Sequence, residues 1–195
     1  MISSPAGRGR PRDERSGAAI VRAAAELVAE SGYAAMSMGA VATRAGVGKD
    51  TIYRRWSGKP ELVYEAVFTA ADTAELPDTG TLEGDLTAVV QSLVEEFSAP
   101  AAAAALPGLL ADFAATPKLR ATIRSRFLQP AKQRLVAVFD RAAQRGEMGA
   151  DVPVDLMLDT LAGAVFFHLG IVGEHPDPDL SRRIAAMITK GIEVR

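Results

Sequence analysis

The chain has 195 residues, 48% of them hydrophobic and 24% charged, which is typical of a water-soluble globular protein with one medium-sized or two small domains. It has no cysteine, which excludes disulfides and thiolate metal sites and suits the cytoplasm, where we expect the protein to act. The net charge is only −2, but the charges are segregated along the chain. Residues 1–60 carry ten Lys or Arg and five Asp or Glu, whereas residues 61–195 carry twelve Lys or Arg and nineteen Asp or Glu. This asymmetry indicates that the first part of the chain binds a polyanion.

The N-terminus, MISSPAGRGRPR, is too rich in Gly, Pro, Ser and Arg to pack, so we expect a disordered basic arm over residues 1–12. Such an arm acts either as a solubilising tail or as a minor-groove contact through Arg8, Arg10 and Arg12. Apolar residues at helical spacing then predict a first helix over residues 13–31.

The segment from Ser37 to Lys59 has the pattern of a helix-turn-helix. Ser37 is a suitable N-cap for the first helix, and Gly46 can adopt the positive φ of a tight turn between helices. After Gly48, a second helix is expected from Lys49 to about Trp56. A helical wheel places its apolar residues on one face and its polar residues on the other, as any solvated surface helix would, but the basic residues around both helices favour DNA as the ligand.

A set of ordered positions within residues 16–67 is specific for one class of DNA-binding domain. These positions are Val41-Ala42, Ala45-Gly46-Val47, Thr51-Ile52-Tyr53, Trp56, Lys59 and Leu62-Val63. On these residues the segment resembles the DNA-binding domain of TetR-family transcriptional regulators. It departs from the family pattern at Gly48, where a Ser or Thr cap is usual, and at Gly39, inside the first helix of the motif.

Nine residues of this segment are predicted to contact DNA. Thr51 and Arg54 are assigned to base edges, because an arginine can bond guanine bidentately and the threonine methyl can meet thymine. Asp50, one helical turn before Arg54, either orients that arginine or accepts a hydrogen bond from a cytosine amine. Phosphate contacts are assigned to Ser37, Arg44, Lys49, Tyr53, Arg55 and Lys59.

A helix starting at Pro60 is expected to complete a DNA-binding domain over residues 13–75, and the sequence ELPDTG, residues 75–80, predicts a linker. Residues 81–195 then form a larger helical domain for ligand binding and dimerisation. Its helices are expected over about 82–97, 101–113, 117–146 with a bend at Pro130, 153–172 and 180–192. The fold class is therefore all-α, with about nine helices.

The last two predicted helices, Val154 to Val172 and Leu180 to Ile192, combine small residues that permit close approach with large apolar ones. Two such helices from each of two subunits can pack as a four-helix bundle; the alternative is that they bury against their own domain. We expect a homodimer, because twofold pairing matches DNA half-sites about 34 to 36 Å apart, or a multiple of that, whereas a single head covers too few bases.

A small-molecule pocket is expected between the helices of the second domain. The candidates for its lining are Phe97, Phe113, Phe127, Phe139, Phe166, Phe167 and His168. The resemblance implies that a small apolar effector in such a pocket moves the linker helix and changes the spacing of the DNA-binding units.

No catalytic, cofactor or metal site is expected. His168 and His175 could share a helix face, but Gly173 and Pro176 break the helix between and after them, and zinc normally has at least three protein ligands. The chain has no GxSxG, phosphate-binding glycine loop or HExxH motif. No run approaches the roughly eighteen apolar residues of a membrane span, so we expect neither an export signal nor a membrane partner.

These observations predict a cytoplasmic, homodimeric transcriptional regulator that binds a pseudo-palindromic DNA operator. We expect a repressor rather than an activator, released by its effector. Two alternatives stay open: a ligand-independent architectural DNA-binding protein, which would not discriminate sequences in a footprint, and a small helical enzyme, whose activity would survive mutation of the helix at 49–55.

Overall fold

The computed structural model describes residues 10–69, 75–149, 152–174 and 177–192, and the regular elements within these ranges are all helical. The elements are α1 (Arg10–Ala35), α2 (Met38–Ala45), α3 (Lys49–Tyr53), α4 (Lys59–Phe68), α5 (Leu82–Ser98), α6 (Pro100–Ala115), α7 (Pro117–Ile123), η2 (Arg124–Leu128), α8 (Gln129–Gln144), α9 (Val154–Val165), η3 (Phe166–Val172) and α10 (Leu180–Ile192). The π-helical segment η2 joins α7 to α8 in one continuous helix, and η3 continues α9. Counted in this way, the described residues form nine helices, and the prediction of an all-α fold is confirmed.

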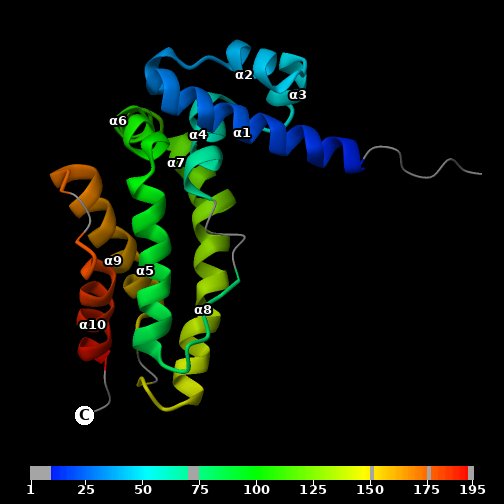
Figure 1. Ribbon diagram of the computed structural model, residues 1–195. Helices are drawn as coiled ribbons and strands as arrows, with labels where there is room; N and C mark the ends of the chain where they lie inside the picture. The colour runs from blue at the N-terminus through cyan, green and yellow to red at the C-terminus, as the bar shows by residue number, and fades with distance from the viewer. Residues whose placement is uncertain (1–9, 70–74, 150–151, 175–176, 193–195) are drawn as a thin grey trace, which may run out of the picture.

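The first four helices form a compact unit, which we call the head (residues 10–69), at one end of the molecule (Figure 1). Its core contains Ile20 of α1, Ile52 of α3 and Leu62 of α4, none of which is exposed. Leu109 of α6 belongs to the same core, so the head rests on the second domain through a shared hydrophobic cluster.

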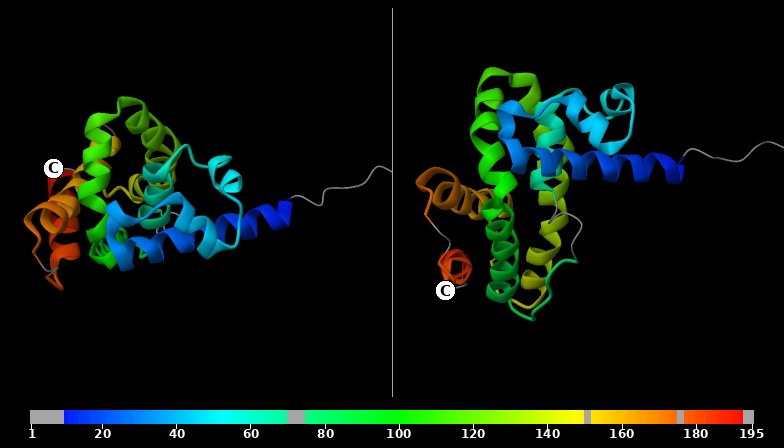
Figure 2. Two further views of the ribbon diagram at one scale, coloured as in Figure 1. Left: turned by 90° about the horizontal axis from the view of Figure 1, so that it is seen from above. Right: turned by 45° about the horizontal axis from the view of Figure 1, so that its top comes forward.

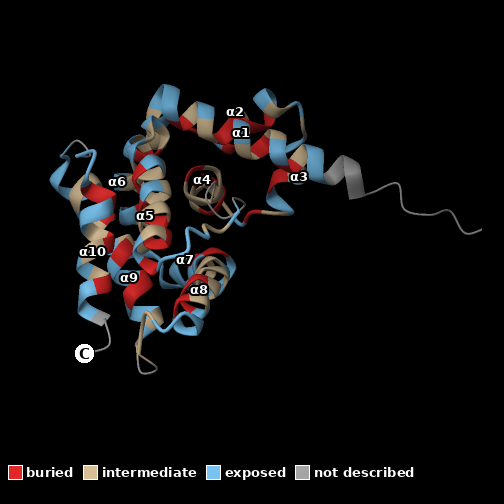
Figure 3. Cartoon of the chain, turned by 60° about the horizontal axis from the view of Figure 1, so that its bottom comes forward, coloured by how far each residue is buried: buried red, intermediate tan, exposed pale blue. Residues whose placement is uncertain are grey.

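Helices α5 to α10 form the second domain, which we call the body (residues 75–192). Its core joins α5, α8, α9 and α10 through residues such as Leu86, Phe139 and Leu161, each about 1% exposed. Figure 3 shows that the buried parts of these helices, in red, face one another. Helices α9 and α10 lie on the side of the body away from α3, as Figures 1 and 2 both show.

The boundaries of the head differ from the predictions at both ends. Helix α1 begins at Arg10, inside the range predicted as a disordered arm, because a proline is tolerated in the first turn of a helix. The rest of that arm, including Arg8, lies outside the described residues. Gly32, predicted to end the helix, has φ 80° and ψ 166° and breaks α1 before Ala35. Helix α4 ends at Phe68, before the predicted end near residue 74, and residues 70–74 are also outside the described ranges.

The predicted bend at Pro130 takes the form of a π-helical segment. Pro130 has no backbone N–H, so the carbonyl of Arg126 loses its α-helical partner. The backbone N–H of Gln129 donates to the carbonyl of Arg124, five residues earlier, which is the π-helical pattern. The predicted single helix over 117–146 is therefore α7, η2 and α8 in sequence.

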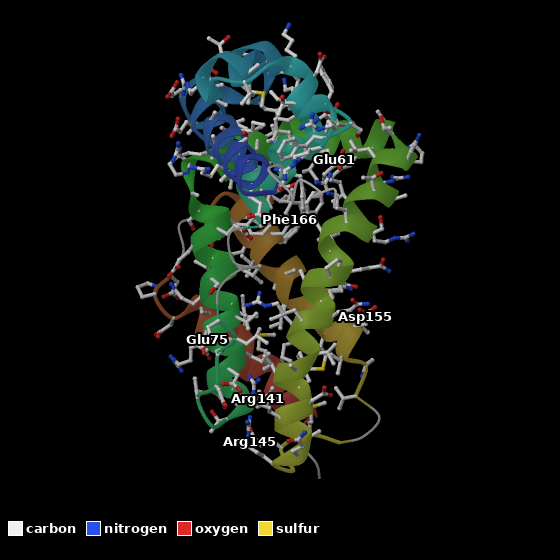
Figure 4. The ribbon with its side chains drawn as sticks, turned by 90° about the vertical axis from the view of Figure 1, so that its right-hand side faces the viewer. Glu61, Glu75, Arg141, Arg145, Asp155 and Phe166 are labelled. Atoms are coloured by element: carbon white, nitrogen blue, oxygen red, sulfur yellow. The ribbon has the colours of Figure 1, made fainter. Side chains whose placement is uncertain are left out.

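The linker before α5 is fixed to the base of the body. Asp85 is completely buried, and its Oδ1 accepts hydrogen bonds from the backbone N–H (2.6 Å) and the hydroxyl (2.9 Å) of Thr79. Arg145 lies 3.5 Å from the other carboxylate oxygen of Asp85, and Arg141 donates to the carbonyl of Pro77. Figure 4 shows both arginines at this end of α8. The linker is thus irregular in structure but held in place.

Among the described residues, the segment Val154–Val172 corrects the expectation that no run resembles a membrane span. Its most apolar 18-residue window has a mean hydropathy of 1.5, enough by length and composition to cross a membrane, and only 22% of that window is buried within the chain. Helices α5 and α6 meet the same criterion only if the two are taken together as one span, and the chain bends by 80° between them. One side of this segment packs in the core of the body, and the apolar residues on its exposed side are available to contact another surface.

Candidate nucleic-acid interface

Helices α2 and α3 form the predicted helix-turn-helix. The hydroxyl oxygen of Ser37 accepts a hydrogen bond from the backbone N–H of Ala40 at 3.1 Å, which caps α2 as expected. Gly46 ends α2 with φ 66° and ψ 35°, a left-handed conformation that favours glycine and turns the chain sharply toward α3. Both local predictions are confirmed.

Helix α3 is anchored by buried apolar residues and presents polar residues outward. Ile52 is fully buried and Trp56 is 1% exposed. Regular α-helix ends at Tyr53 rather than near Trp56, but the backbone N–H groups of Arg54 and Trp56 still donate to carbonyls four residues earlier, at 3.1 and 3.0 Å. The exposed side chains are those of Lys49, Asp50, Tyr53 and Arg54, with Thr51 half-buried between them. The structure therefore brings five of the nine predicted DNA contacts to one surface.

Gly39 permits a close approach within this surface. A Cβ atom at this position would lie 3.1 Å from Cε of Lys49, which is tighter than most side-chain contacts. The glycine inside α2, a departure from the family pattern, therefore leaves room for the Lys49 side chain to lie across that helix.

Arg44, predicted to contact phosphate, instead forms a bidentate pair within the head. Its two terminal nitrogens donate to the two carboxylate oxygens of Glu30 in α1, both at 2.7 Å. The hydrogen bond from Arg44 lowers the pKa of Glu30 below its ordinary value, as expected for a carboxylate that is paired with a cation. A phosphate would have to compete with Glu30 for this arginine.

Lys59 and Arg55, also predicted as phosphate contacts, lie against other parts of the head. Nζ of Lys59 is 4.3 Å from the centre of the Tyr33 ring and donates to the carbonyl of Ala34 at 3.2 Å. Burial lowers the pKa of Lys59 from its ordinary value. Arg55 is half-buried, with its guanidinium 6.0 Å from the centre of the Trp56 ring. In this structure, Lys59 and Arg55 therefore make contacts within the head.

A cavity of about 550 Å³ lies between α4 and the helices of the body. Four of the seven predicted residues line it: Phe97, Phe113, Phe127 and Phe166. Figure 4 shows Phe166 just beneath the head. Two further aromatic rings come from α4, where sequence reasoning placed no lining residue. Tyr64 lies 5.3 Å from Phe127 between ring centres, and Phe68 lies 5.3 Å from Phe97.

The structure places the other three predicted residues outside the lining of this cavity. Phe139 lies in the core of the body at 1% exposure, one helical turn beyond Leu135, a residue of α8 that lines the cavity. Phe167 is 60% exposed, and His168 lies 3.5 Å from Glu174, outside the cavity. Successive helical residues point about 100° apart, so an inward Phe166 turns the next two side chains away.

The polar lining of the cavity includes Ser92, Glu96 and the pair formed by Lys132 and Asp159, whose charged atoms are 2.6 Å apart. Within the described residues, no group of three or more His, Cys, Asp or Glu could hold a metal ion, and His175 lies outside those residues. The site is an apolar cavity with a few charged groups at its wall.

Comparison with known proteins gives matches to both parts of the chain. A family model described as "Bacterial regulatory proteins, tetR family" matches residues 20–66, and one described as "Tetracyclin repressor-like, C-terminal domain" matches residues 76–188. The chain is 30% identical over 187 residues to the "Uncharacterized HTH-type transcriptional regulator YdeS" of Bacillus subtilis, covering 95% of this chain and 94% of the relative. It is 32% identical over 176 residues to the "DNA-binding transcriptional repressor TetR" of Mycobacteroides abscessus, covering 89% and 92%.

Among solved structures, the crystal structure of the "TetR family transcription regulator SCO0332" is similar over the whole molecule. The TM-score is 0.76 at 26% sequence identity, and the match covers 91% of this chain and 98% of that one. The similarity therefore includes both the head and the body.

Proposed function

The chain belongs to the TetR family of DNA-binding transcriptional regulators, and from that premise we propose that it is a cytoplasmic repressor that binds a pseudo-palindromic operator as a homodimer. We further propose that a small, mainly apolar molecule in the cavity releases it from DNA. The observation that carries the proposal is the outward face of α3, where Lys49, Asp50, Tyr53 and Arg54 are exposed together. The relative named as a repressor supports this mode of action.

The homodimer is supported by the uncovered apolar surface of the last two helices, which we call the α9–α10 face. Its most exposed members are Leu156 (62%), Phe167 (60%), Ile171 (53%) and Met187 (76%). Large apolar side chains exposed on two neighbouring helices support an interaction site there. Pairing of two such faces about a twofold axis would cover them and give one α3 per half-site.

The effector is supported by the size and position of the cavity. A volume of about 550 Å³ falls within the roughly 300 to 1,000 Å³ of small-molecule sites. Tyr64 and Phe68 line it from α4, the helix that joins the head to the linker. A molecule that displaces these rings would tilt α4 and with it the head.

Footprinting on the DNA flanking the protein's own gene tests the proposed function, since such regulators often act locally. We expect protection of two related half-sites whose centres are about 34 to 36 Å apart or a multiple of that, in the presence of competitor DNA. Uniform protection without sequence preference would favour an architectural protein. Failure to bind any duplex at low salt would contradict the proposal.

Arg54→Ala is expected to relax the preference for one base pair by about 1 to 3 kcal/mol, because this arginine is assigned to a base edge. Lys49→Ala is the matched control on the same surface. It should weaken binding to all sequences alike. It should also reduce the slope of log K against log salt concentration by about 0.9. Titrations of the two variants against single-base-pair variants of the operator, at several salt concentrations, check both. The reverse pattern would exchange the two assignments.

A further inference from the structure

Arg126 joins the body to the head through one guanidinium group. It lies in η2, and its Nη1 donates to the carbonyl oxygen of Arg55 at 2.7 Å. The same nitrogen donates to Oε1 of Glu61, and Nη2 donates to Oε2 of Glu65 at 3.2 Å. Glu61 belongs to α4 and lies on the side of the head that faces the helix of η2 and α8 (Figure 4). Three acceptors more than 60 residues away in the sequence thus converge on one side chain.

The two glutamates also bind the segment that directly follows α3, which is the recognition helix in the proposed function. The second carboxylate oxygen of Glu61 accepts hydrogen bonds from the backbone N–H and the hydroxyl of Ser57, both at 2.7 Å. Oε2 of Glu65 accepts a hydrogen bond from Nε1 of Trp56 at 2.7 Å. Arg55, Trp56 and Ser57 are therefore connected to Arg126 directly or through one carboxylate.

Glu61 makes this contact different from an exposed ion pair. The residue is 3% exposed, and burial alone would raise its pKa. The hydrogen bonds from Ser57 and the charge of Arg126 outweigh burial, so that the pKa of Glu61 lies below its ordinary value and the carboxylate is charged. Because a buried carboxylate is costly without a cation, loss of Arg126 would disturb the segment that Glu61 holds.

The next residue along the chain faces the cavity. Phe127 is 8% exposed and lines the cavity beside Tyr64, while the guanidinium of Arg126 lies 5.1 Å from the centre of the Phe127 ring. Both residues belong to the five-residue π-helical segment, a local geometry that is common at functional sites. A displacement of Phe127 by a molecule in the cavity would therefore move Arg126 as well.

We propose that Arg126 is a positioning residue for DNA binding, which fixes the end of α3 relative to the body and through which the cavity acts on the head. This inference rests on the proposed function. The hydrogen bond from Tyr33 to Asp112 also joins the head to the body, but it lies at the end of α1 and does not involve residues 55–57. Of these two contacts, that of Arg126 is the one with the segment directly after α3.

The test uses the full-length protein and a duplex recovered by repeated selection of random-sequence DNA on the wild type. Arg126→Ala is expected to weaken binding to this duplex by about 5- to 100-fold, the usual range of coupling between sites. It is also expected to reduce the penalty for adding or removing one base pair between the half-sites, because heads that are no longer fixed tolerate altered spacing. Arg126→Lys should be intermediate, since a single ammonium cannot satisfy three acceptors at once.

Arg124→Ala is the matched control, because this arginine lies on the same segment and, among the described residues, its guanidinium has no hydrogen bond to the head; the variant should bind as the wild type does. Thermal melting separates positioning from folding. A lower melting temperature with an unchanged spacing penalty would show a merely structural role and would overturn the inference. If the alanine variant does not fold, the same comparison is made with Arg126→Lys.

A cavity-filling variant tests the route from the cavity. Ser92→Phe places a ring among the lining residues and should weaken DNA binding in the wild type but add little in the Arg126→Ala background. Equal effects in both backgrounds, or no effect in either, would overturn the route through Arg126. A wild type that recovers no duplex would overturn the proposed function and this inference together, whereas a folded Arg126→Ala variant that matches a DNA-binding wild type overturns this inference alone.

Discussion

Phe167→Asp is expected to make the protein monomeric at micromolar concentration and to weaken operator binding by at least about 100-fold, because the gain from binding two half-sites together is lost. Phe167 is 60% exposed in the single chain, on the α9–α10 face. In a twofold interface it is buried twice, and each burial contributes about 1.5 to 3 kcal/mol. The substitution removes both contributions and places two carboxylates in an apolar interface, where unpaired charges are costly.

Sedimentation equilibrium and operator titrations measure the two effects on the same sample. Val136→Asp is the matched control, since Val136 is an apolar residue that is 36% exposed on α8, outside the α9–α10 face. This variant should stay dimeric and keep the affinity of the wild type. A Phe167→Asp variant that sediments as a dimer and binds normally would place the subunit interface elsewhere.

The features that the sequence predicted correctly depend on residues close together in the chain. The cap at Ser37 and the turn at Gly46 each require only a few neighbouring positions, and both have the expected geometry. The last helix has the predicted bounds, Leu180 to Ile192, because an amphipathic pattern defines it over its whole length. Local hydrogen bonds and helical periodicity were sufficient for these elements.

The cavity was predicted only in part because its lining depends on how helices pack. Helix α9 and η3 are apolar on most sides, so periodicity could not decide whether Phe166 or Phe167 faces inward. The contributions of Tyr64 and Phe68 require α4 to lie against the body, which no spacing within that helix reveals. Aromatic residues alone identify a set of candidates rather than a surface.

The roles of basic residues show the same limit. Charge segregation identified the basic end of the chain, but it could not separate cations that face solvent from cations used inside the protein. Arg44 pairs with Glu30, fourteen residues earlier, and Lys59 packs on Tyr33. Arg126 had no local signal, because its partner Glu61 is 65 residues away and only tertiary packing brings the two together.

Trp56→Ala is expected to lower the free energy of unfolding by about 3 to 5 kcal/mol, the usual cost of truncating a buried aromatic side chain. Trp56 is 1% exposed in the core of the head, and its ring N–H donates to Glu65 at 2.7 Å. The substitution leaves a void and removes a hydrogen bond to a charged group. Because domains are stable by only about 5 to 15 kcal/mol, this loss is large enough to leave the head partly unfolded at moderate temperature.

Chemical denaturation followed by circular dichroism measures this change, since Trp56 is the single tryptophan and its fluorescence is lost in the variant. Trp56→Phe keeps a ring in the core but lacks the N–H donor, so its stability should fall between those of the wild type and the alanine variant. Tyr53→Ala is the matched control three residues earlier; Tyr53 is 52% exposed, and its removal should change stability by no more than about 0.5 kcal/mol. A Trp56→Ala variant that unfolds at the same denaturant concentration as the wild type would mean that this ring does not form the core of the head in solution.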